Sequence, residues 1–364
     1  MTLEELRAEI DQADRDLVFL LNRRARISQQ VGQIKREQAG VGREPHIYQP
    51  DREAQVYAQV DALNQGPLPN SALHAIYREI LSSSRAVQRP LRVGYLGPVA
   101  TFAYEAAKRH FGSEATVVPC RTIADVFVET EKRTVDYGVV PVENSTGGAV
   151  ISTLDSFLET ELQICAEILL PVSHNLLSRG KLDQITQVYS HPQALAQCRR
   201  WLAEWLPRAT LVETASTALA AQMVQDEQSA AISTEAASEV YGLPLVARRI
   251  EDESTNVTRF LVIGPHRSEP TGHDRTALVF AVHDRVGALQ DGLRWFAENA
   301  INLTRIESRP SRRRLWEYVF FVDLDGHPAD DHVARAIEGL RQSCAFVRVL
   351  GTWPASRVAE PVAE

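Results

Sequence analysis

The sequence lacks a long hydrophobic run and has few cysteines, and both absences narrow the class of protein. Hydrophobic residues make up 44% of the 364 residues, but no run is long enough to span a bilayer, so we expect no membrane segment. We also expect no signal peptide before the first predicted helix. The chain is also poor in basic residues: 39 Lys and Arg against 47 Asp and Glu give a net charge of -8, which argues against a nucleic-acid partner.

The cysteines indicate the compartment. The four are far apart in the sequence and match no metal-ligand spacing, so we expect no metal site: they are Cys120, Cys165, Cys198 and Cys344. Such isolated thiols are typical of reduced packing residues, and we therefore expect a cytoplasmic protein.

The length of the chain and the positions of its turn-forming segments together predict several domains. A chain of 364 residues is long enough for two or three of them. A helical pattern ends at Gln88-Arg89-Pro90, and a polar segment runs from Gly264 to His273. We therefore expect an all-helical domain (1–90), a two-lobed α/β domain (91–265), a linker (266–274), a smaller α+β domain (275–353) and a tail (354–364) that is disordered.

Strand-like runs alternate with helical patterns in the α/β domain, and the smaller domain shows a different order. The strands predicted in the α/β domain are 92–96, 137–142, 187–190, 230–233 and 259–263. The smaller domain reads βαββαβ, with strands at 276–282, 302–308, 315–324 and 347–352 and helices at 288–298 and about 330–343.

The first predicted helix, residues 3 to about 34, carries cations on or beside its apolar stripe. Arg24 falls on the stripe and Lys35 lies beside its last member. At about 100° per residue these two lie within about 20° of each other, whereas Arg7 points about 100° away from Arg24. A lone helical cation usually extends into solvent. Two cations on one face of a buried stripe instead indicate an anion site, because desolvating an unpaired ion costs several kcal/mol.

This helical pattern is longer than an ordinary globular helix, so we expect it to pack along a second copy of itself, in a homo-oligomer of at least two chains. Arg7 would then complete the pocket of the partner chain. Further polar groups follow along the sequence. Arg52 and Glu53 lie in the first turn of a second predicted helix, and Ser84 and Gln88 lie four residues apart at the end of a third, over 71–88.

These residues resemble the all-helical chorismate mutase domain, a dimer of interlocked long helices. The family usually has Asp where this chain has Gln49. The resemblance implies a rearrangement of chorismate to prephenate without a cofactor, in which arginines grip two carboxylates, Lys35 and Gln88 donate to the ether oxygen, and Glu53 accepts from the ring hydroxyl. The matching site positions are Arg7 (from the other subunit), Arg24, Lys35, Gln49, Arg52, Glu53, Ser84 and Gln88.

Polar clusters at strand ends mark a second site in the α/β domain. Glu143-Asn144 follows an apolar strand and enters a Gly-rich turn, Ser190-His191-Pro192-Gln193 follows another strand, and Thr258-Arg259-Phe260 begins the last one. A single polar turn of this kind is usually a helix cap. Ligands of open α/β sheets bind at the carboxyl ends of strands, so several such clusters together indicate a binding cleft.

Together with Tyr95-Leu96-Gly97-Pro98 and Thr101-Phe102, these runs closely resemble prephenate dehydratase, whose two lobes are related to periplasmic-type binding folds. The likeness implies that Thr258 donates to the hydroxyl that leaves, with CO2, as prephenate becomes aromatic. Ala100 and Ala103 replace the glycine and the hydroxyl residue that are common in the family. By the same likeness, the residues that shape the substrate cleft are Glu143, Asn144, Gln193 and Arg259.

Two short runs in the smaller domain have both a structural and a functional interpretation. Gly287-Ala288-Leu289 is compatible with a simple tight turn, and the strand Ile306–Pro310 with a stop at its proline. Together with Trp316-Glu317-Tyr318, they resemble the phenylalanine-binding ACT domain, which implies that free amides at a helix start receive the carboxylate of the amino acid. The implied effector residues are Gly287, Ala288, Leu289, Glu307 and Ser308.

The order of the three resemblances predicts a bifunctional enzyme of phenylalanine biosynthesis that converts chorismate through prephenate to phenylpyruvate and is inhibited by phenylalanine. Two alternatives remain open from the residues. One is a sensor of amino or aromatic acids that keeps the cleft and the ACT domain but has lost turnover. The other is a helical-dimer scaffold with a dehydratase attached, in which Gln49 or the altered first motif has disabled one site. Separate assays with chorismate and prephenate distinguish them.

Overall fold

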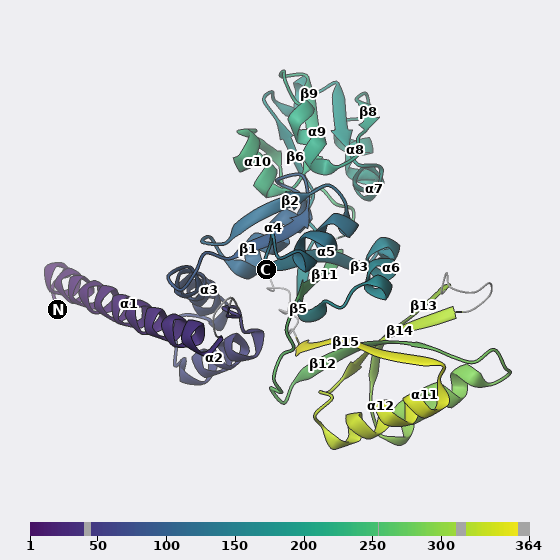
Figure 1. Cartoon of the computed structure of the whole chain (residues 1–364). Coiled ribbons are helices and arrows are strands. Elements are labelled where there is room, and N and C mark those ends of the chain that lie inside the picture. The colour runs from purple at the N-terminus through teal and green to yellow at the C-terminus, as the bar shows by residue number, and fades with distance from the viewer. Residues whose placement is uncertain (40–44, 254, 311–317, 356–364) are drawn as a thin grey trace. The chain divides into compact units, whose positions relative to one another are not determined.

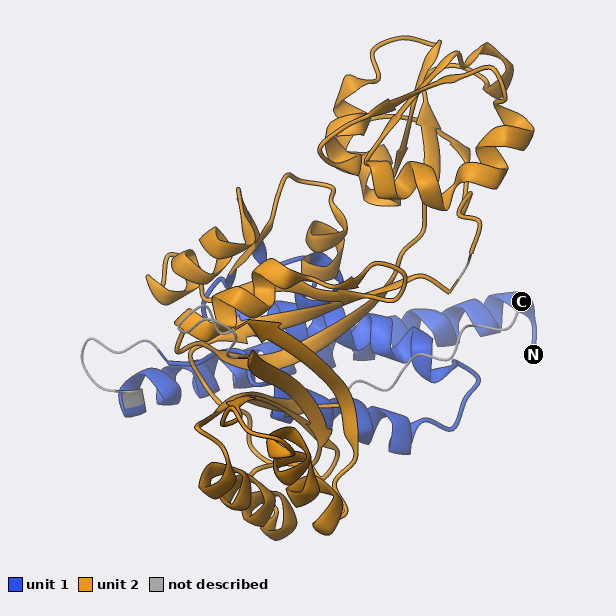
Figure 2. Ribbon diagram, turned by 90° about the vertical axis from the view of Figure 1, so that its right-hand side faces the viewer, with its two compact units in different colours: residues 1–92, 108–116 blue, residues 93–107, 117–364 orange. Residues whose placement is uncertain are grey.

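The computed structural model describes residues 1–39, 45–253, 255–310 and 318–355. The chain divides into two compact units, one formed by Met1–Arg92 and Lys108–Thr116 and the other by the remaining residues (Figure 2). Trp316 and Glu317 of the predicted ACT motif, and the predicted tail from residue 356 onward, lie outside the described residues.

The first unit is helical. Its longest helix, α1, has 37 residues and extends well beyond the other two (Figure 1). Glu4 and Glu5 in its first turn and Arg36 in its last turn suit the helix dipole. Helix α3 packs against both α1 and α2. The bounds are α1 (Leu3–Ala39), α2 (Pro50–Leu63) and α3 (Asn70–Ala86).

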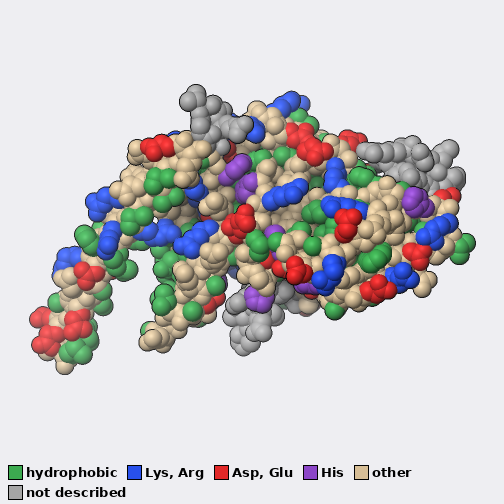
Figure 3. Space-filling model, turned by 60° about the horizontal axis from the view of Figure 1, so that its bottom comes forward, with side chains coloured by type: hydrophobic (Ala, Val, Ile, Leu, Met, Phe, Trp, Pro, Cys, Tyr) green, Lys and Arg blue, Asp and Glu red, His purple; other side chains and the backbone are tan. Residues whose placement is uncertain are grey.

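The apolar stripe of α1 is exposed in the single chain. In the space-filling view, hydrophobic side chains lie among charged ones along α1, which is at the left (Figure 3). An exposed apolar surface of this length is typical of a surface that packs against another chain. Its large apolar side chains, each at least 41% exposed, are Leu3, Leu6, Ile10, Leu17, Leu20, Leu21, Ile27, Val31 and Ile34.

The last residues of helix α4 (Phe102–Phe111) and the turn after it pack with the helical unit. Gly112 is essential to this packing. Its φ of +78° lies in the left-handed region, and a Cβ at this position would lie 2.5 Å from the Cβ of Ser82 on α3. Only glycine combines this conformation with such a close approach.

Two sheets make up most of the second unit. The larger has the order β13-β14-β12-β15-β5-β11-β3-β1-β2, with β4 paired to β3, and the smaller has the order β10-β6-β9-β7-β8. The strands of the larger sheet are β1 (Arg92–Leu96), β2 (Thr116–Cys120), β3 (Tyr137–Asn144), β4 (Gly148–Ala149), β5 (Gln163–Pro171), β11 (Val257–Gly264), β12 (Asp274–Ala281), β13 (Leu303–Pro310), β14 (Tyr318–Asp325) and β15 (Phe346–Pro354). Those of the smaller sheet are β6 (Asn175–Ser178), β7 (Gln187–Ser190), β8 (Thr210–Glu213), β9 (Ser229–Ser233) and β10 (Leu245–Ala247).

Helices cover these sheets, and several begin at a side-chain cap. The side chain of Thr122 caps α5, that of Ser216 caps α9 and that of Thr234 caps α10. The helices of this unit after α4 are α5 (Ile123–Glu131), α6 (Ile151–Glu159), α7 (Pro192–Gln197), α8 (Arg199–Trp205), α9 (Thr217–Met223), α10 (Glu235–Tyr241), α11 (Ala288–Glu298) and α12 (Asp331–Ser343), with a 3₁₀ turn at Leu182–Gln184.

The larger sheet joins the lobe that contains β3 to the βαββαβ domain. Strand β15 meets β5 in parallel, and Gly351 pairs with Ile164. A Cβ on Gly351 would lie 2.3 Å from the carbonyl oxygen of Ile164, so the glycine allows the two backbones to meet. One hydrophobic core continues across this junction and contains Phe157 from one side and Phe321 and Trp353 from the other.

The predicted fold class is confirmed: a helical part, an α/β part with two lobes, and a βαββαβ part. Every strand named in the sequence analysis is present, with small shifts of the described ends; residues 315–317 of the predicted strand 315–324 lie outside the described residues. The strands β2, β4, β5, β6, β8 and β10 were not predicted, and neither was the continuous sheet that β5 makes with β15. Helix α3 ends at Ala86, so Gln88 lies beyond the helix and not within it as predicted.

Candidate functional sites

The helical unit holds two half-buried cations whose hydrogen-bond partners are neutral. Arg24 donates from Nη1 to the hydroxyl of Ser84. Lys35 donates from Nζ to Oε1 of Gln49 and to the carbonyl oxygen of His46, both at 3.1 Å. Burial lowers the pKa of both cations. Because neutral oxygens do not cancel their charge, the two cations remain available to an anionic ligand.

Glu53, one turn into α2, is the acidic group of this pocket. Its carboxylate pairs with the guanidinium of Arg85 on α3. Burial raises the pKa of Glu53, and the charge of Arg85 only partly opposes this effect. Glu53 is close enough to Arg24 and Lys35 to influence the pKa of each. Cations from α1 therefore lie near two carboxylates of α2, Glu53 and Asp51.

Gln88 lies against α1 because Gly32 leaves room for it. A Cβ on Gly32 would lie 2.8 Å from Cγ of Gln88. The Gln88 amide donates from Nε2 to the carbonyl oxygen of Ser84 at 2.9 Å, while its Oε1 is buried and has no partner among the described residues. Gly32 was not predicted to be part of this site. A glycine that interrupts the apolar stripe of a long helix was the available signal.

The two remaining predicted arginines of this site are exposed. Arg52 donates to Oε1 of Gln55 at 3.0 Å and is close enough to Arg24 to lower its pKa. Arg7 is exposed near the start of α1, and seventeen residues of helix separate it from Arg24. At about 1.5 Å per residue this distance is about 25 Å, so Arg7 cannot reach the pocket of its own chain.

The α/β site is centred on the pairing of β11 with β3. Thr258 lies opposite Asn144 in this antiparallel pair, and the hydroxyl of Thr258 accepts a hydrogen bond from Nδ2 of Asn144 at 2.9 Å. A hydroxyl has one proton and two lone pairs. No bond donated by this hydroxyl is found within the described ranges, so its proton is available for a ligand.

Asn144 also organises the turn that follows β3. Its Oδ1 accepts from the hydroxyl of Thr146 at 2.7 Å and from the amide of Gly147 at 2.8 Å. Gln193, at the start of α7 in the second lobe, reaches the same oxygen at 3.5 Å. The predicted residues Asn144, Gln193 and Thr258 are therefore brought together from both lobes.

Gln197 is a functional candidate that the sequence analysis missed. Its Nε2 donates to the hydroxyl of Thr146 at 2.9 Å, and its Oε1 accepts from Nδ2 of Asn256 at 3.1 Å. The ring Nε2 of His174 lies 2.7 Å from the same Oε1. Gln197 lies one turn after Gln193 on α7, and this helical spacing was the signal that could have identified it.

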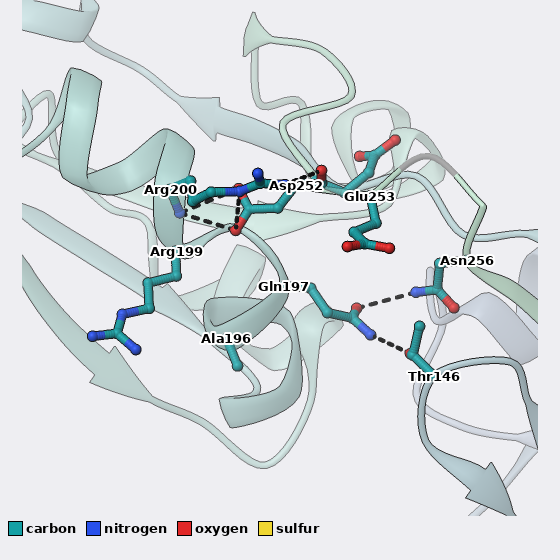
Figure 4. A pocket seen from close by; sticks show the side chains of 9 residues that line it. Thr146, Ala196, Gln197, Arg199, Arg200, Asp252, Glu253 and Asn256 are labelled. Carbon is teal, nitrogen blue, oxygen red and sulfur yellow. Dashed lines mark hydrogen bonds and ion pairs between the residues drawn. The ribbon is translucent and has the colours of Figure 1, made fainter.

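A pocket of about 330 Å³ opens beside this network (Figure 4). The side chains of Gln197, Asn256 and Thr146 point toward one another along one wall (Figure 4). On the opposite wall the guanidinium of Arg200 donates to the carbonyl oxygen of Asp252 at 2.6 Å. The lining residues are Thr146, Ala196, Gln197, Arg199, Arg200, Glu251, Asp252, Glu253 and Asn256.

Glu143 and Arg259 do not share the face of Thr258 and Asn144. Successive side chains of a strand point to opposite faces. Arg259 accordingly contacts Glu167 at 3.0 Å and Asp323 of β14 at 2.5 Å, and Glu143 contacts Arg305 of β13 at 3.3 Å. These two side chains, predicted to shape the substrate cleft, are directed toward the βαββαβ domain instead.

The βαββαβ domain presents the predicted effector residues at a helix start and along a strand. Gly287 precedes α11 with φ +79°, and a Cβ at this position would have no atom within 4 Å. Ala288 is buried and Leu289 is half-buried. On β13 every second residue is half-buried, which places Glu307 on the same face as Arg305 and Ser308 on the other face.

Metal and membrane sites can be examined over the described part of the chain. There, no group of three or more His, Cys, Asp or Glu side chains could hold a metal ion. No described helix is both long and apolar enough to cross a membrane.

Comparisons with known proteins agree with this three-part organisation. The chain matches the family models of chorismate mutase type II over residues 6–89, prephenate dehydratase over 93–268 and the ACT domain over 276–342. A bifunctional chorismate mutase/prephenate dehydratase of Aquifex aeolicus is 44% identical over 364 residues, which cover 98% of this chain and 99% of the relative. The corresponding protein of Pseudomonas aeruginosa is 44% identical over 355 residues, 97% of each chain.

A solved structure extends the comparison to three dimensions. Prephenate dehydratase of Arthrobacter aurescens, in complex with L-Phe, superposes with a TM-score of 0.68 at 34% identity, over 73% of this chain and 90% of that one. The likeness to the Aquifex and Pseudomonas proteins extends over nearly the full length of each, and the three family models match this chain one after another in the predicted order. The chain therefore belongs to the family of bifunctional chorismate mutase/prephenate dehydratases and has both activities.

Proposed function

We propose that chorismate binds in the pocket of Arg24, Lys35 and Glu53, and that prephenate is then dehydrated at Thr258. The observation that carries the first assignment is the pair of half-buried cations with neutral partners. Chorismate is a dianion, and its rearrangement needs neither a nucleophile nor a cofactor. The protein therefore has to hold the substrate compact and stabilise charge on the ether oxygen.

Lys35 is the donor to the ether oxygen in this proposal. Its ammonium now donates to Gln49 and His46, and these are bonds that a substrate oxygen can replace. Gln88 supplies a second donor, because rotation of its amide exchanges Nε2 for the unpartnered Oε1. Arg24 grips a carboxylate, and Glu53 accepts from the ring hydroxyl.

The lowered pKa of Lys35 leads to a pH prediction. Only the charged ammonium stabilises the ether oxygen, so mutase kcat/KM should fall as the pH rises through a value below the 10.5 of an ordinary lysine. Lys35→Arg keeps the charge to a higher pH, so the variant should be slower but should lose this alkaline decline. Initial rates with chorismate across pH measure the effect, with prephenate turnover as the control. An identical alkaline decline in the variant would exclude Lys35 as its source.

We further propose that the enzyme is at least a dimer, built on the exposed stripe of α1, and that it works in the cytoplasm. The stripe supports the dimer because it exposes apolar side chains along the whole helix. Arg7 supports it independently, because it is too far along α1 to serve its own pocket and would enter that of a partner chain. The cytoplasm is supported by four free, buried cysteines.

Subunit mixing tests the shared pocket. Arg7→Ala and Arg24→Ala chains should each lose mutase activity, because each removes a carboxylate grip. A heterodimer of the two variants contains one pocket with both arginines intact, so each heterodimer should have about half of the activity of the unaltered dimer, and a randomly exchanged equal mixture about a quarter. The measurement is mutase rate after verified subunit exchange. Exchange without any recovery would contradict an Arg7 shared between chains.

The dehydratase proposal rests on the hydroxyl of Thr258. Because that hydroxyl already accepts from Asn144, its own proton is directed to another acceptor, which we take to be the leaving hydroxyl of prephenate. Thr is a weak acid, so positioning by Asn144, Gln193 and Gln197 and the drive of the ring to aromatise supply most of the acceleration.

Thr258→Val tests this role because valine has nearly the same shape and lacks the hydroxyl. Prephenate turnover should fall by about a hundredfold or more, since one positioned proton donor is lost. Mutase activity should not change, because Thr258 lies in the other compact unit. Full turnover of prephenate by the variant would mean that another group handles the leaving hydroxyl. Glu143 is a poor substitute, because it lies on the other face of the sheet.

We propose that phenylalanine binds where the helix start at Gly287 of one ACT domain meets β13 of another, and that it closes the dehydratase cleft. The ion pairs of β13 and β14 support this coupling. Arg305 of β13 contacts Glu143, and Asp323 of β14 contacts Arg259, the residue next to Thr258. A shift of β13 on effector binding would reach β3 through the Arg305–Glu143 ion pair. A shift of its neighbour β14 would reach β11, the strand of Thr258, through the Asp323–Arg259 ion pair.

Gly287→Val tests the effector site. A Cβ at Gly287 meets no protein atom within 4 Å, so valine would fill space left for the ligand. The side chain also disfavours the left-handed φ of +79°. Dehydratase activity without phenylalanine should remain, while the phenylalanine concentration needed for inhibition rises by about tenfold or more. Calorimetry that gives an unchanged phenylalanine affinity would refute the placement.

A further inference from the structure

Arg85 is a buried cation that the proposed mutase mechanism does not use. It lies on α3 next to Ser84, and only 5% of its surface is exposed. One arm of its guanidinium pairs with the carboxylate of Glu53. The other arm, Nη2, donates to the backbone carbonyl oxygen of Phe111 at 2.6 Å. Arg85 therefore connects the acidic group of the mutase pocket to the end of α4.

The end of α4 forms a tightly packed wall around this arginine. The ring of Tyr48 meets those of His110 and Phe111 edge-on, at centroid distances of 5.7 and 5.1 Å. The hydroxyl of Tyr48 and Nε2 of His110 are 2.6 Å apart. The guanidinium of Arg85 lies 5.7 Å over the Tyr48 ring and 6.0 Å over the Phe111 ring. Burial lowers the pKa of His110 to about 3, so this wall has no competing cation at neutral pH.

The geometry of arginine suits this double contact. Its five N–H groups have a fixed planar arrangement, so an arm held by the Phe111 carbonyl fixes the direction of the arm that meets Glu53. We propose that Arg85 is a positioning residue of the mutase site, which holds the Glu53 carboxylate in place for the substrate hydroxyl and is itself anchored by the end of α4. The proposal rests on the assignment of Glu53 to the mutase pocket.

The charge around Glu53 predicts what loss of Arg85 does. Arg24 and Lys35 face it from α1, Asp51 and Tyr57 belong to its own helix, and Arg85 is the group that pairs with it from α3. Without Arg85 the buried carboxylate loses its contacting cation, and its pKa rises further because burial is no longer opposed by a direct partner.

The test compares Arg85→Met, Arg85→Lys, Glu53→Gln and the double variant Arg85→Met/Glu53→Gln in the full chain. Arg85→Met should lower mutase kcat/KM at neutral pH by roughly tenfold to a hundredfold and move the acid limb of its pH profile upward. Arg85→Lys keeps a cation beside Glu53, so its acid limb should stay near that of the unaltered enzyme, although lysine lacks the fixed planar fork that reaches both the Glu53 carboxylate and the Phe111 carbonyl oxygen.

The double variant distinguishes a positioning role of Arg85 from a purely structural one. If Arg85 acts through Glu53, Arg85→Met should cost less than about threefold in the Glu53→Gln background, because the carboxylate it positions is already absent. Multiplicative losses would overturn the proposal, as would an unmoved acid limb in Arg85→Met. The double variant also removes the buried unpaired charge, so it decides the question even where Arg85→Met alone fails to fold.

Two controls complete the design. Arg78→Met is a matched variant on α3, because Arg78 is partly exposed and pairs with its neighbour Glu79, and it should leave the mutase pH profile unchanged. Arg24→Ala tests the pocket itself. If Arg24→Ala keeps full mutase activity, the proposed pocket is wrong. If Arg24→Ala is inactive while Arg85→Met behaves like the unaltered enzyme, only the positioning role fails.

A substitution just after α4 tests whether the end of this helix anchors Arg85. In Gly112→Ala the new Cβ would lie 2.5 Å from the Cβ of Ser82, so the turn after Phe111 has to move away from α3. Mutase kcat/KM should fall by about fivefold or more with the acid limb raised, and adding Ser82→Gly should restore part of the loss. A folded Gly112→Ala enzyme with an unchanged mutase profile would overturn the anchoring role.

Discussion

The pairing of β11 with β3 is the constraint on which the dehydratase site and its link to the ACT domain both depend. In this register Thr258 lies opposite Asn144, and Arg259 lies opposite Glu143. The first pair faces the proposed dehydratase cleft and the second pair faces the ACT domain, because neighbouring residues of a strand point to opposite faces. A slip of one residue along β11 would exchange the faces of the two pairs. The proposed catalytic site and the ion pairs to the ACT domain thus depend on the same backbone hydrogen bonds.

Much of the fold could be predicted from the sequence because its signals are local. Helical periodicity identified α1, alternating strands and helices identified the α/β part, and the polar runs at strand ends identified Asn144, Gln193 and Thr258, which the structure brings together. Strand β5 was missed because an apolar run without clear alternation does not distinguish a buried strand from a buried helix. Its pairing with β15 depends on the close approach of the two backbones at Gly351, which no local sequence pattern indicates.

The direction of individual side chains was less predictable than the positions of the motifs. The motif Thr258-Arg259-Phe260 places a cation next to a catalytic candidate, and only the register of β11 shows that Arg259 is directed away from the cleft. Similarly, the pairing of Glu53 with Arg85 joins residues from two helices, and the approach of α4 to α3 joins segments that belong to different domains by sequence. Such contacts follow from tertiary packing and leave little trace in local composition.

The buried and half-buried cations discussed above fall into two classes according to the groups they contact. Arg85 and Arg259 each contact a carboxylate, and Arg259 contacts two, so their charge is already neutralised and they serve to hold other groups. The described hydrogen bonds of Arg24 and Lys35 go to neutral oxygens instead, and burial lowers the pKa of both. A half-buried cation without a contacting carboxylate is stabilised when an anion arrives. In the proposed mutase mechanism, Arg24 and Lys35 therefore gain a contacting counter-charge only when the dianionic chorismate binds.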